Sequence, residues 1–190
     1  MNVPSVIAVE GLDRLGKTTL VDGLRQKLGY HEVIHFSKPQ TLEYYRDVPR
    51  PSDVPVNMAH IWAYQHDSFV NSMQLANSGA NIIFDRWHIG EAVWSPMFRG
   101  FSGDYVFNIE KNFLKVPVRL ILLIEDFAIA RHFVDDGESL GTVEQREEIQ
   151  KRFIEAVDRS SIKDKRIICV TDPGVGGFKP REQILAEALA

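Results

Sequence analysis

Near its N-terminus the chain carries glycines, a lysine and threonines at a spacing that suits phosphate binding. An apolar run leads directly into G-x-x-x-x-G-K-[ST], from Gly11 to Thr18. Gly11 and Gly16 allow the backbone to turn a row of N–H groups onto a polyphosphate at a helix N-terminus. We expect Lys17 to reach the β- and γ-phosphates and the Thr18 hydroxyl to ligate Mg²⁺. The predicted nucleotide-binding loop consists of Gly11, Leu12, Asp13, Arg14, Leu15, Gly16, Lys17, Thr18 and Thr19.

A second group of charged residues follows the third apolar run. Asp85 and Arg86 stand where a strand should end, and open parallel sheets bind ligands beyond the carboxyl ends of their strands. The guanidinium of Arg86 offers a planar fork of donors to a phosphate, and Asp85 could orient it or a magnesium-bound water. A salt bridge at a strand end is the structural alternative. Two phosphate-binding elements at one crevice favour phosphoryl transfer, which depends on cations and positioning more than on a nucleophile.

Five apolar runs are expected to form the strands that position these residues. Segments long enough for crossover helices separate the runs, which is typical of a parallel sheet. The continuous apolar character of the first, third, fourth and fifth runs predicts strands covered on both faces. We therefore predict a three-layer α/β/α fold whose five-stranded parallel sheet consists of Ser5 to Val9, Glu32 to Phe36, Asn81 to Phe84, Val118 to Ile124 and Arg166 to Val170.

Two further segments are expected to complete one domain over residues 1–190. A proline-rich stretch precedes a predicted helix from about Met58 to Asn77, and we expect the stretch to shape a substrate pocket. Residues 127–157 look helical but are interrupted by the polar segment 135–141. A small helical lid, at about 131–146, and a surface turn between two helices both fit this interruption.

Composition and charge indicate which class of ligand the protein binds. Acidic residues outnumber basic ones by 26 to 22, so the net charge is −4 and nothing indicates the basic footprint of a DNA- or RNA-binding protein. The one cysteine, Cys169, lies in an apolar run, where we expect a small buried core residue, and it cannot form an internal disulfide. The longest apolar run, 120–124, is too short to cross a bilayer. We predict a cytoplasmic protein that binds a nucleotide and has neither a membrane nor a nucleic acid as partner.

With both motifs in view, the chain resembles the thymidylate kinases (dTMP kinases) among the P-loop nucleoside monophosphate kinases. Val9 to Thr19 is similar to the family's P-loop in its form with an Asp-Arg pair inside the loop. Asp85-Arg86-Trp87 is similar to the family's D-R-[YFWH] motif. The resemblance spans nearly the whole chain by element order, and the length and divergent middle are similar to compact virus-encoded members. It implies transfer of the γ-phosphoryl group of ATP, with Mg²⁺, to dTMP or a close pyrimidine deoxynucleotide, in a homodimer.

The same resemblance implies functions for particular charged residues. Arg14 would supply the charge that other kinases bring from the lid and would stabilise the migrating phosphoryl group. Asp13 would contact the 3′-hydroxyl of the acceptor sugar, and Arg86 its 5′-phosphate. Arg131 would lie near the ATP phosphates. Lys38 falls near the family's basic residue on the acceptor phosphate, although a solvated loop lysine fits equally well.

The acceptor base is expected to meet the helix predicted over 58–77. Gln65 stands where many cellular members carry an arginine that reads the thymine carbonyl, and a glutamine can pair with the N3–H and O4 edge of thymine. The family's residue that stacks on the base falls near Ile61 and Trp62. For Trp62, packing in the core is the alternative. The remaining candidates for the acceptor site are Trp87, His88 and Arg99, with a structural hydrogen bond as the alternative for His88 and a surface position for Arg99.

Three other activities compete with this interpretation. A deoxynucleoside kinase would phosphorylate the nucleoside itself. Kinases of that class generally carry Ser or Gly at the position of Arg14 and an E-R-S motif in place of Asp85-Arg86-Trp87, so by resemblance both features favour the monophosphate kinase. A regulatory GTPase would need the base-reading motif N-K-x-D, which the sequence lacks. A kinase acting on a modified base within DNA would need a basic groove.

Overall fold

The computed structural model describes residues 4–29, 31–36, 54–130 and 143–190. At its centre is a five-stranded sheet in the order β2-β3-β1-β4-β5, and every neighbouring pair is parallel. This confirms the predicted sheet, with boundaries that differ by a few residues. The strands are β1 (Val6–Gly11), β2 (Glu32–His35), β3 (Ile82–Asp85), β4 (Val118–Ile124) and β5 (Asp164–Cys169).

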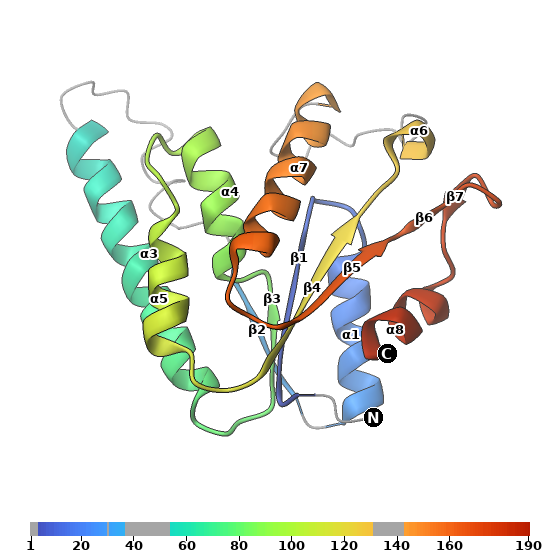
Figure 1. The fold of residues 1–190 in the computed structure, drawn as a ribbon, viewed down its shortest axis with the longest axis horizontal. Coiled ribbons are helices and arrows are strands. Elements are labelled where there is room, and N and C mark those ends of the chain that lie inside the picture. The colour runs from blue at the N-terminus through green and yellow to red at the C-terminus, as the bar shows by residue number, and fades with distance from the viewer. Residues whose placement is uncertain (1–3, 30, 37–53, 131–142) are drawn as a thin grey trace.

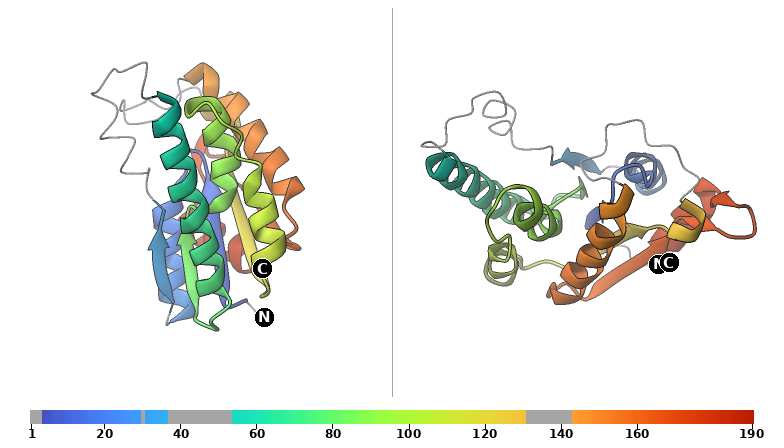
Figure 2. Two further views of the ribbon diagram at one scale, coloured as in Figure 1. Left: turned by 90° about the vertical axis from the view of Figure 1, so that its left-hand side faces the viewer. Right: turned by 90° about the horizontal axis from the view of Figure 1, so that it is seen from above.

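Helices cover both faces of the sheet, as Figure 1 shows. On one face lie α1 (Lys17–Leu28) and α8 (Arg181–Leu189), and on the other lie α3 (Val54–Ala76), α4 (His88–Phe98), α5 (Tyr105–Phe113) and α7 (Val143–Arg159). The view from above in Figure 2 separates the three layers. A one-turn helix, α6 (Phe127–Ala130), follows β4. No helix in the described ranges combines the length and the apolar character that crossing a membrane requires.

The hydrophobic core is built around the central strands of the sheet. Every residue of β1 and β3 is buried, and so are the first six residues of β4, as expected for parallel strands between two helical layers. The same expectation for the fifth run is wrong. β5 is an edge strand on which α8 packs, and Ile167 remains 49% exposed there. Cys169, at the end of this strand, is half-buried and not a core residue.

Two further differences concern short elements. The helix predicted from Met58 begins at Val54, and after β5 the chain forms a small antiparallel hairpin of β6 (Thr171–Asp172) and β7 (Gly177–Phe178) that was not predicted. Strands of two residues leave no apolar alternation in a sequence, so propensity could not predict them. The hairpin carries the chain from the sheet back to α8.

A buried hydrogen-bonded cluster joins α4, α5 and the segment after α7. Nε2 of His88 lies 2.7 Å from Oε2 of Glu110, and both side chains are buried. Glu110 also accepts hydrogen bonds from Ser160 and Ser161. Burial alone would raise the pKa of Glu110, but the hydrogen bond and charge of His88, with the serine donors, lower it from 4.5 to about 2. This carboxylate therefore stabilises the fold above pH 4.5, and that contribution is lost as the pH falls towards 2.

Replacing Glu110 by Gln is expected to lower the free energy of unfolding by about 3 kcal/mol, because buried donors lose a charged acceptor. Urea unfolding at pH 7 measures the change. Glu148→Gln is the matched control, since Glu148 pairs with Arg152 on the exposed surface of α7 and should lose less than about 0.5 kcal/mol. Equal losses in the two variants would contradict a stabilising function for the buried cluster.

Candidate functional site

The turn between β1 and α1 has the geometry of a phosphate-binding loop. Gly11 has a φ of 137°, and a Cβ atom there would lie 2.5 Å from the backbone oxygen of Leu123 on β4. Gly16 has a φ of 79° immediately before α1 begins. Both positions therefore require glycine, one for a close approach and both for a left-handed backbone. The loop ends at the N-terminus of α1, where unpaired N–H groups favour an anion.

Lys17 lies inside this loop, 5% exposed. Its ammonium donates to the backbone oxygens of Gly11 at 2.9 Å and Leu12 at 2.5 Å, and lies 3.9 Å from the carboxylate of Asp13. Burial, followed by repulsion from Arg86, lowers the pKa of Lys17 from 10.5 to about 8. The lysine thus occupies the place of a phosphate-binding cation and carries a charge that a bound anion would reinforce.

The end of β3 brings Asp85 and Arg86 to the same loop. The Thr18 hydroxyl lies 3.4 Å from Oδ2 of Asp85, and Nδ1 of His35 lies 3.0 Å from the same oxygen. Arg86 donates to Oδ1 of Asp13 at 2.7 Å and lies 3.4 Å from Nε2 of His35. Residues that are far apart in sequence therefore meet at the carboxyl ends of β1, β2 and β3.

One oxygen of Asp85 indicates a cation site. Among the described residues Oδ1 of Asp85 is buried and has no hydrogen-bond partner, while Oδ2 faces the Thr18 hydroxyl. Carboxylate and hydroxyl oxygens are ligands that Mg²⁺ accepts together with waters and phosphate oxygens. A divalent cation held here would satisfy the buried oxygen. Thr18 and Asp85 therefore fit a magnesium ion.

Glu10, which precedes the loop, holds the two phosphate-binding elements together. Its Oε1 accepts the backbone N–H groups of Trp87 at 2.8 Å and Gly90 at 3.1 Å. Burial raises the pKa of Glu10 from 4.5 to about 7, although these N–H groups and nearby cations oppose the shift. Sequence reasoning did not select Glu10 as a functional residue, although a carboxylate at the end of an apolar strand indicates such a position.

A pocket opens beside Arg86 and Asp13. Phe36 and Phe69 stack at one side of it, with ring centroids 5.4 Å apart and an interplanar angle of 22°. A flat aromatic ring can lie against such a surface. The residues that line the pocket are Glu10, Asp13, Phe36, Gln65, Phe69, Arg86, Trp87, Gly90, Glu91, Trp94 and Arg99.

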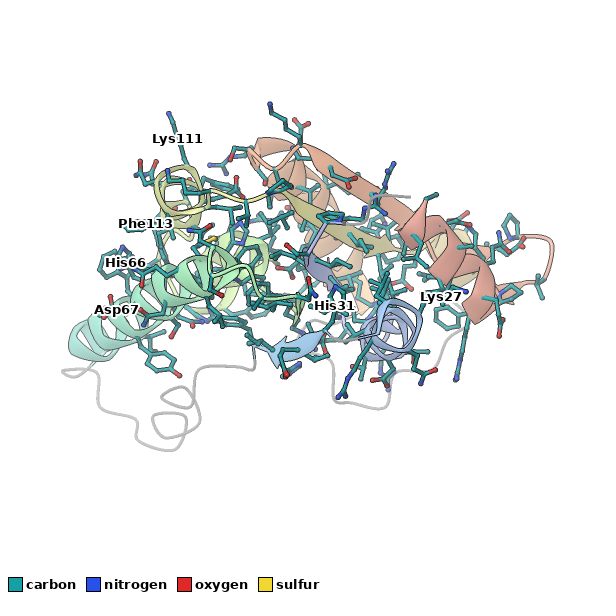
Figure 3. The ribbon with its side chains drawn as sticks, turned by 90° about the horizontal axis from the view of Figure 1, so that it is seen from below. Lys27, His31, His66, Asp67, Lys111 and Phe113 are labelled. Carbon is teal, nitrogen blue, oxygen red and sulfur yellow. The ribbon has the colours of Figure 1, made fainter. Side chains whose placement is uncertain are left out.

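The structure places some of the predicted acceptor residues elsewhere. Ile61 is buried and Trp62 is 41% exposed, and neither lines the pocket. The ring of Trp62 stacks on His66 at 5.1 Å, and Figure 3 shows His66 and Asp67 on the outer side of α3, far from Lys27 of α1. His88 points to Glu110, which confirms the alternative of a structural hydrogen bond at this residue. Lys38, Arg131 and residues 131–142 of the expected lid lie outside the described residues.

Several polar residues at the site escaped sequence reasoning. Glu91 lines the pocket among the apolar residues of α4. Arg146, on α7, contacts the buried carboxylate of Glu125 at 2.6 Å and the backbone oxygen of Asp13 at 3.3 Å. In the sequence, a charged residue at a buried position of an amphipathic helix could have drawn attention to Glu91 or Arg146. That pattern does not indicate which site the residue belongs to.

A second groove runs along the other side of the P-loop, between α1, β7 and α8. Arg14, with a φ of 71°, lies at one end of the groove, and Phe178 and Lys179 lie near the hairpin. The groove therefore reaches the P-loop on the side of α1 and α8, whereas the pocket beside Arg86 lies on the side of α3 and α4. Its lining includes Arg14, Leu15, Gly16, Thr19, Gly23, Gln26, Phe178, Lys179 and Arg181.

Known proteins share sequence or fold with this chain. No protein-family model matches the chain. A curated thymidylate kinase from Leptospira borgpetersenii serovar Hardjo-bovis (strain L550) is 27% identical over 204 residues, covering 98% of this chain and 92% of that protein. This similarity supports the resemblance to thymidylate kinases that the two motifs carry.

Solved structures of two kinds of kinase share the fold of this chain. The thymidylate kinase from Candida albicans has a TM-score of 0.64 at 21% identity, covering 97% of this chain and 88% of that one. A deoxyadenosine kinase from M. mycoides has a TM-score of 0.57 at 19% identity, covering 97% and 99%. Both kinds of kinase share the same architecture, so the fold by itself does not distinguish the substrate of one kind from that of the other.

Proposed function

We propose that this protein transfers the γ-phosphoryl group of ATP to dTMP or a close pyrimidine deoxynucleoside monophosphate. The observation that carries the proposal is the meeting of the P-loop with the end of β3, where Arg86 pairs with Asp13 at the lining of one pocket and Asp85 lies against Thr18. ATP would place its phosphates in the P-loop, with its nucleoside towards the groove at Arg14. The acceptor would occupy the pocket, with its phosphate at Arg86 and its sugar at Asp13.

In the proposed phosphoryl transfer, some residues position the two substrates and others neutralise the charge of the phosphates. Lys17 and the N-terminus of α1 would hold the ATP phosphates, and Arg14 would stabilise charge on the migrating group. Thr18 and Asp85 would hold Mg²⁺, which supplies charge neutralisation when bound. Arg86 would fix the acceptor phosphate in line. None of these steps needs a covalent intermediate on the protein.

An acceptor screen tests the proposal directly. ADP release from Mg·ATP is measured with dTMP, dUMP, dCMP, dAMP and dGMP and with thymidine, each at the same concentration. Turnover of a pyrimidine monophosphate is the expected result. Turnover of thymidine alone would instead identify a deoxynucleoside kinase, and failure with every acceptor while Mg·ATP still binds would contradict the proposal.

Binding of Mg·ATP is expected to take up protons above pH 8. The pKa of Lys17 is about 8 without a ligand, and a polyphosphate raises it again, so at higher pH binding must recharge the lysine. The affinity should therefore fall by up to about tenfold for each pH unit above 8. Isothermal titration calorimetry at pH 9 in two buffers of different ionisation enthalpy measures the uptake. At pH 6.5 the contribution of Lys17 should vanish, and its persistence there would exclude Lys17 as the source.

The family resemblance also carries the expectations of a homodimer and a cytoplasmic location. Light scattering coupled to size-exclusion chromatography tests the first, with a mass near twice 21.6 kDa expected.

A further inference from the structure

The acceptor pocket contains a carboxylate that the proposed phosphoryl transfer leaves without a function. Glu91 lies on α4, is 3% exposed, and lines the pocket next to Gln65 and Arg99. A buried carboxylate is costly unless it is paired, so Glu91 requires hydrogen-bond partners. The structure shows partners for both carboxylate oxygens.

These partners all donate to Glu91. The hydroxyl of Tyr105 donates to Oε1 at 2.8 Å, and Arg99 donates to Oε2 while also bonding Ser95 at 2.9 Å. Burial, with the charge of Glu91 next, raises the pKa of Tyr105 well above 10, so this hydroxyl keeps its proton. The third donor is the side-chain amide of Gln65, whose Nε2 lies 3.3 Å from Oε2.

The contact with Gln65 fixes which way its amide points. A carboxylate paired with an arginine only accepts hydrogen bonds, so the amide atom that faces it must be the nitrogen. Turning the amide over would place a carbonyl oxygen against a carboxylate oxygen. Gln65 consequently keeps its carbonyl oxygen available as an acceptor for a ligand in the pocket.

We propose that Glu91, held by Arg99 and Tyr105, locks the amide of Gln65 in the orientation that reads a pyrimidine bearing N3–H and O4, and so selects thymine or uracil over cytosine. The inference rests on the proposed function, since it assumes that the acceptor base faces Gln65. In thymine and uracil N3–H meets the Gln65 oxygen, and O4 meets an amide N–H. Cytosine has an acceptor at N3 and an amino group at position 4, so it would need the amide turned over.

Glu91 is a positioning residue in this scheme, because it acts through Gln65. A glutamine at position 91 could donate or accept, and would let the Gln65 amide adopt either orientation. The sharpest probes are dUMP and dCMP, which differ only at this edge of the base. We expect Glu91→Gln to lower the ratio of kcat/KM for dUMP to that for dCMP by about tenfold or more, mostly by improving dCMP, while KM for Mg·ATP stays unchanged.

Two further variants protect this test against a folding defect. Glu91→Gln combined with Arg99→Met removes both buried charges and leaves no unpaired cation, and it should show the same loss of discrimination. Glu148→Gln, on the exposed face of α7, should keep the wild-type ratio. Melting temperatures of all variants report whether each is folded.

Dissociation constants for dUMP and dCMP, measured by calorimetry alongside turnover, separate the inference from the proposed function. A wild-type preference for dUMP that weakens in both Glu91 variants supports the inference. A preference that persists in them, or a wild type that favours dCMP or neither, overturns it even if the kinase activity is present. Absence of turnover with every acceptor overturns the proposed function, and the dissociation constants then decide whether Glu91 sets the preference of the pocket.

Discussion

The Lys17→Met variant is expected to lose turnover by roughly 10³-fold or more, because the phosphates lose the buried cation that neutralises them during transfer. Methionine has nearly the length of lysine and no charge, so it can fill the same space between the loop carbonyls. The variant should stay folded with a melting temperature close to that of the wild type, since the desolvation cost of the buried lysine offsets the hydrogen bonds lost to Gly11 and Leu12. A coupled assay for ADP release, with melting temperatures beside it, measures both effects.

Lys27→Met is the matched control for this experiment. Lys27 belongs to the same helix but is exposed, and Figure 3 shows it away from α3 and α5. Its replacement should leave turnover within about twofold, in line with an exposed charge that touches no site. Comparable turnover in Lys17→Met and Lys27→Met would remove Lys17 from the reaction.

The Arg86→Ala variant is expected to weaken acceptor binding by about 10- to 100-fold, because a charged donor to the acceptor phosphate is lost. The KM for Mg·ATP should change by less than about threefold, since Lys17 and the loop hold those phosphates. Steady-state kinetics with either substrate varied separates the two constants. The distinction matters because Arg86 also pairs with Asp13 at 2.7 Å, a contact that a purely structural residue would make as well.

Two companion variants resolve that ambiguity. Arg86→Lys keeps a positive charge but not the planar fork, so it should recover part of the acceptor affinity. Arg159→Ala removes an exposed arginine that pairs with Asp104 on the surface, and should change neither constant. Equal losses for the acceptor and for ATP in Arg86→Ala would mean that Arg86 supports the P-loop instead of binding the acceptor.

The sequence by itself determined the features that depend on local spacing. The P-loop glycines were recognisable because Gly11 and Gly16 occupy backbone conformations that other residues rarely adopt, and their spacing from Lys17 and Thr18 is short. The central strands were recognisable because a parallel strand buried on both faces is continuously apolar. The placement of Asp85 and Arg86 at a strand end followed from the same pattern. β5 broke the rule, because the helical layers leave part of this edge strand open to solvent.

Only the tertiary structure decided which side chains share the acceptor pocket. Trp62 and Gln65 lie three residues apart on α3, so they adjoin each other on one side of the helix. The neighbouring elements separate them, because Trp62 packs on His66 and Tyr105 while Gln65 reaches Glu91 in the pocket. Glu91, Arg99 and Tyr105 come together from α4, its C-terminal end and α5, through contacts that no local pattern encodes. Charges that are buried as partners of one another depend on packing between helices, and the amphipathic pattern of each helix alone does not specify that packing.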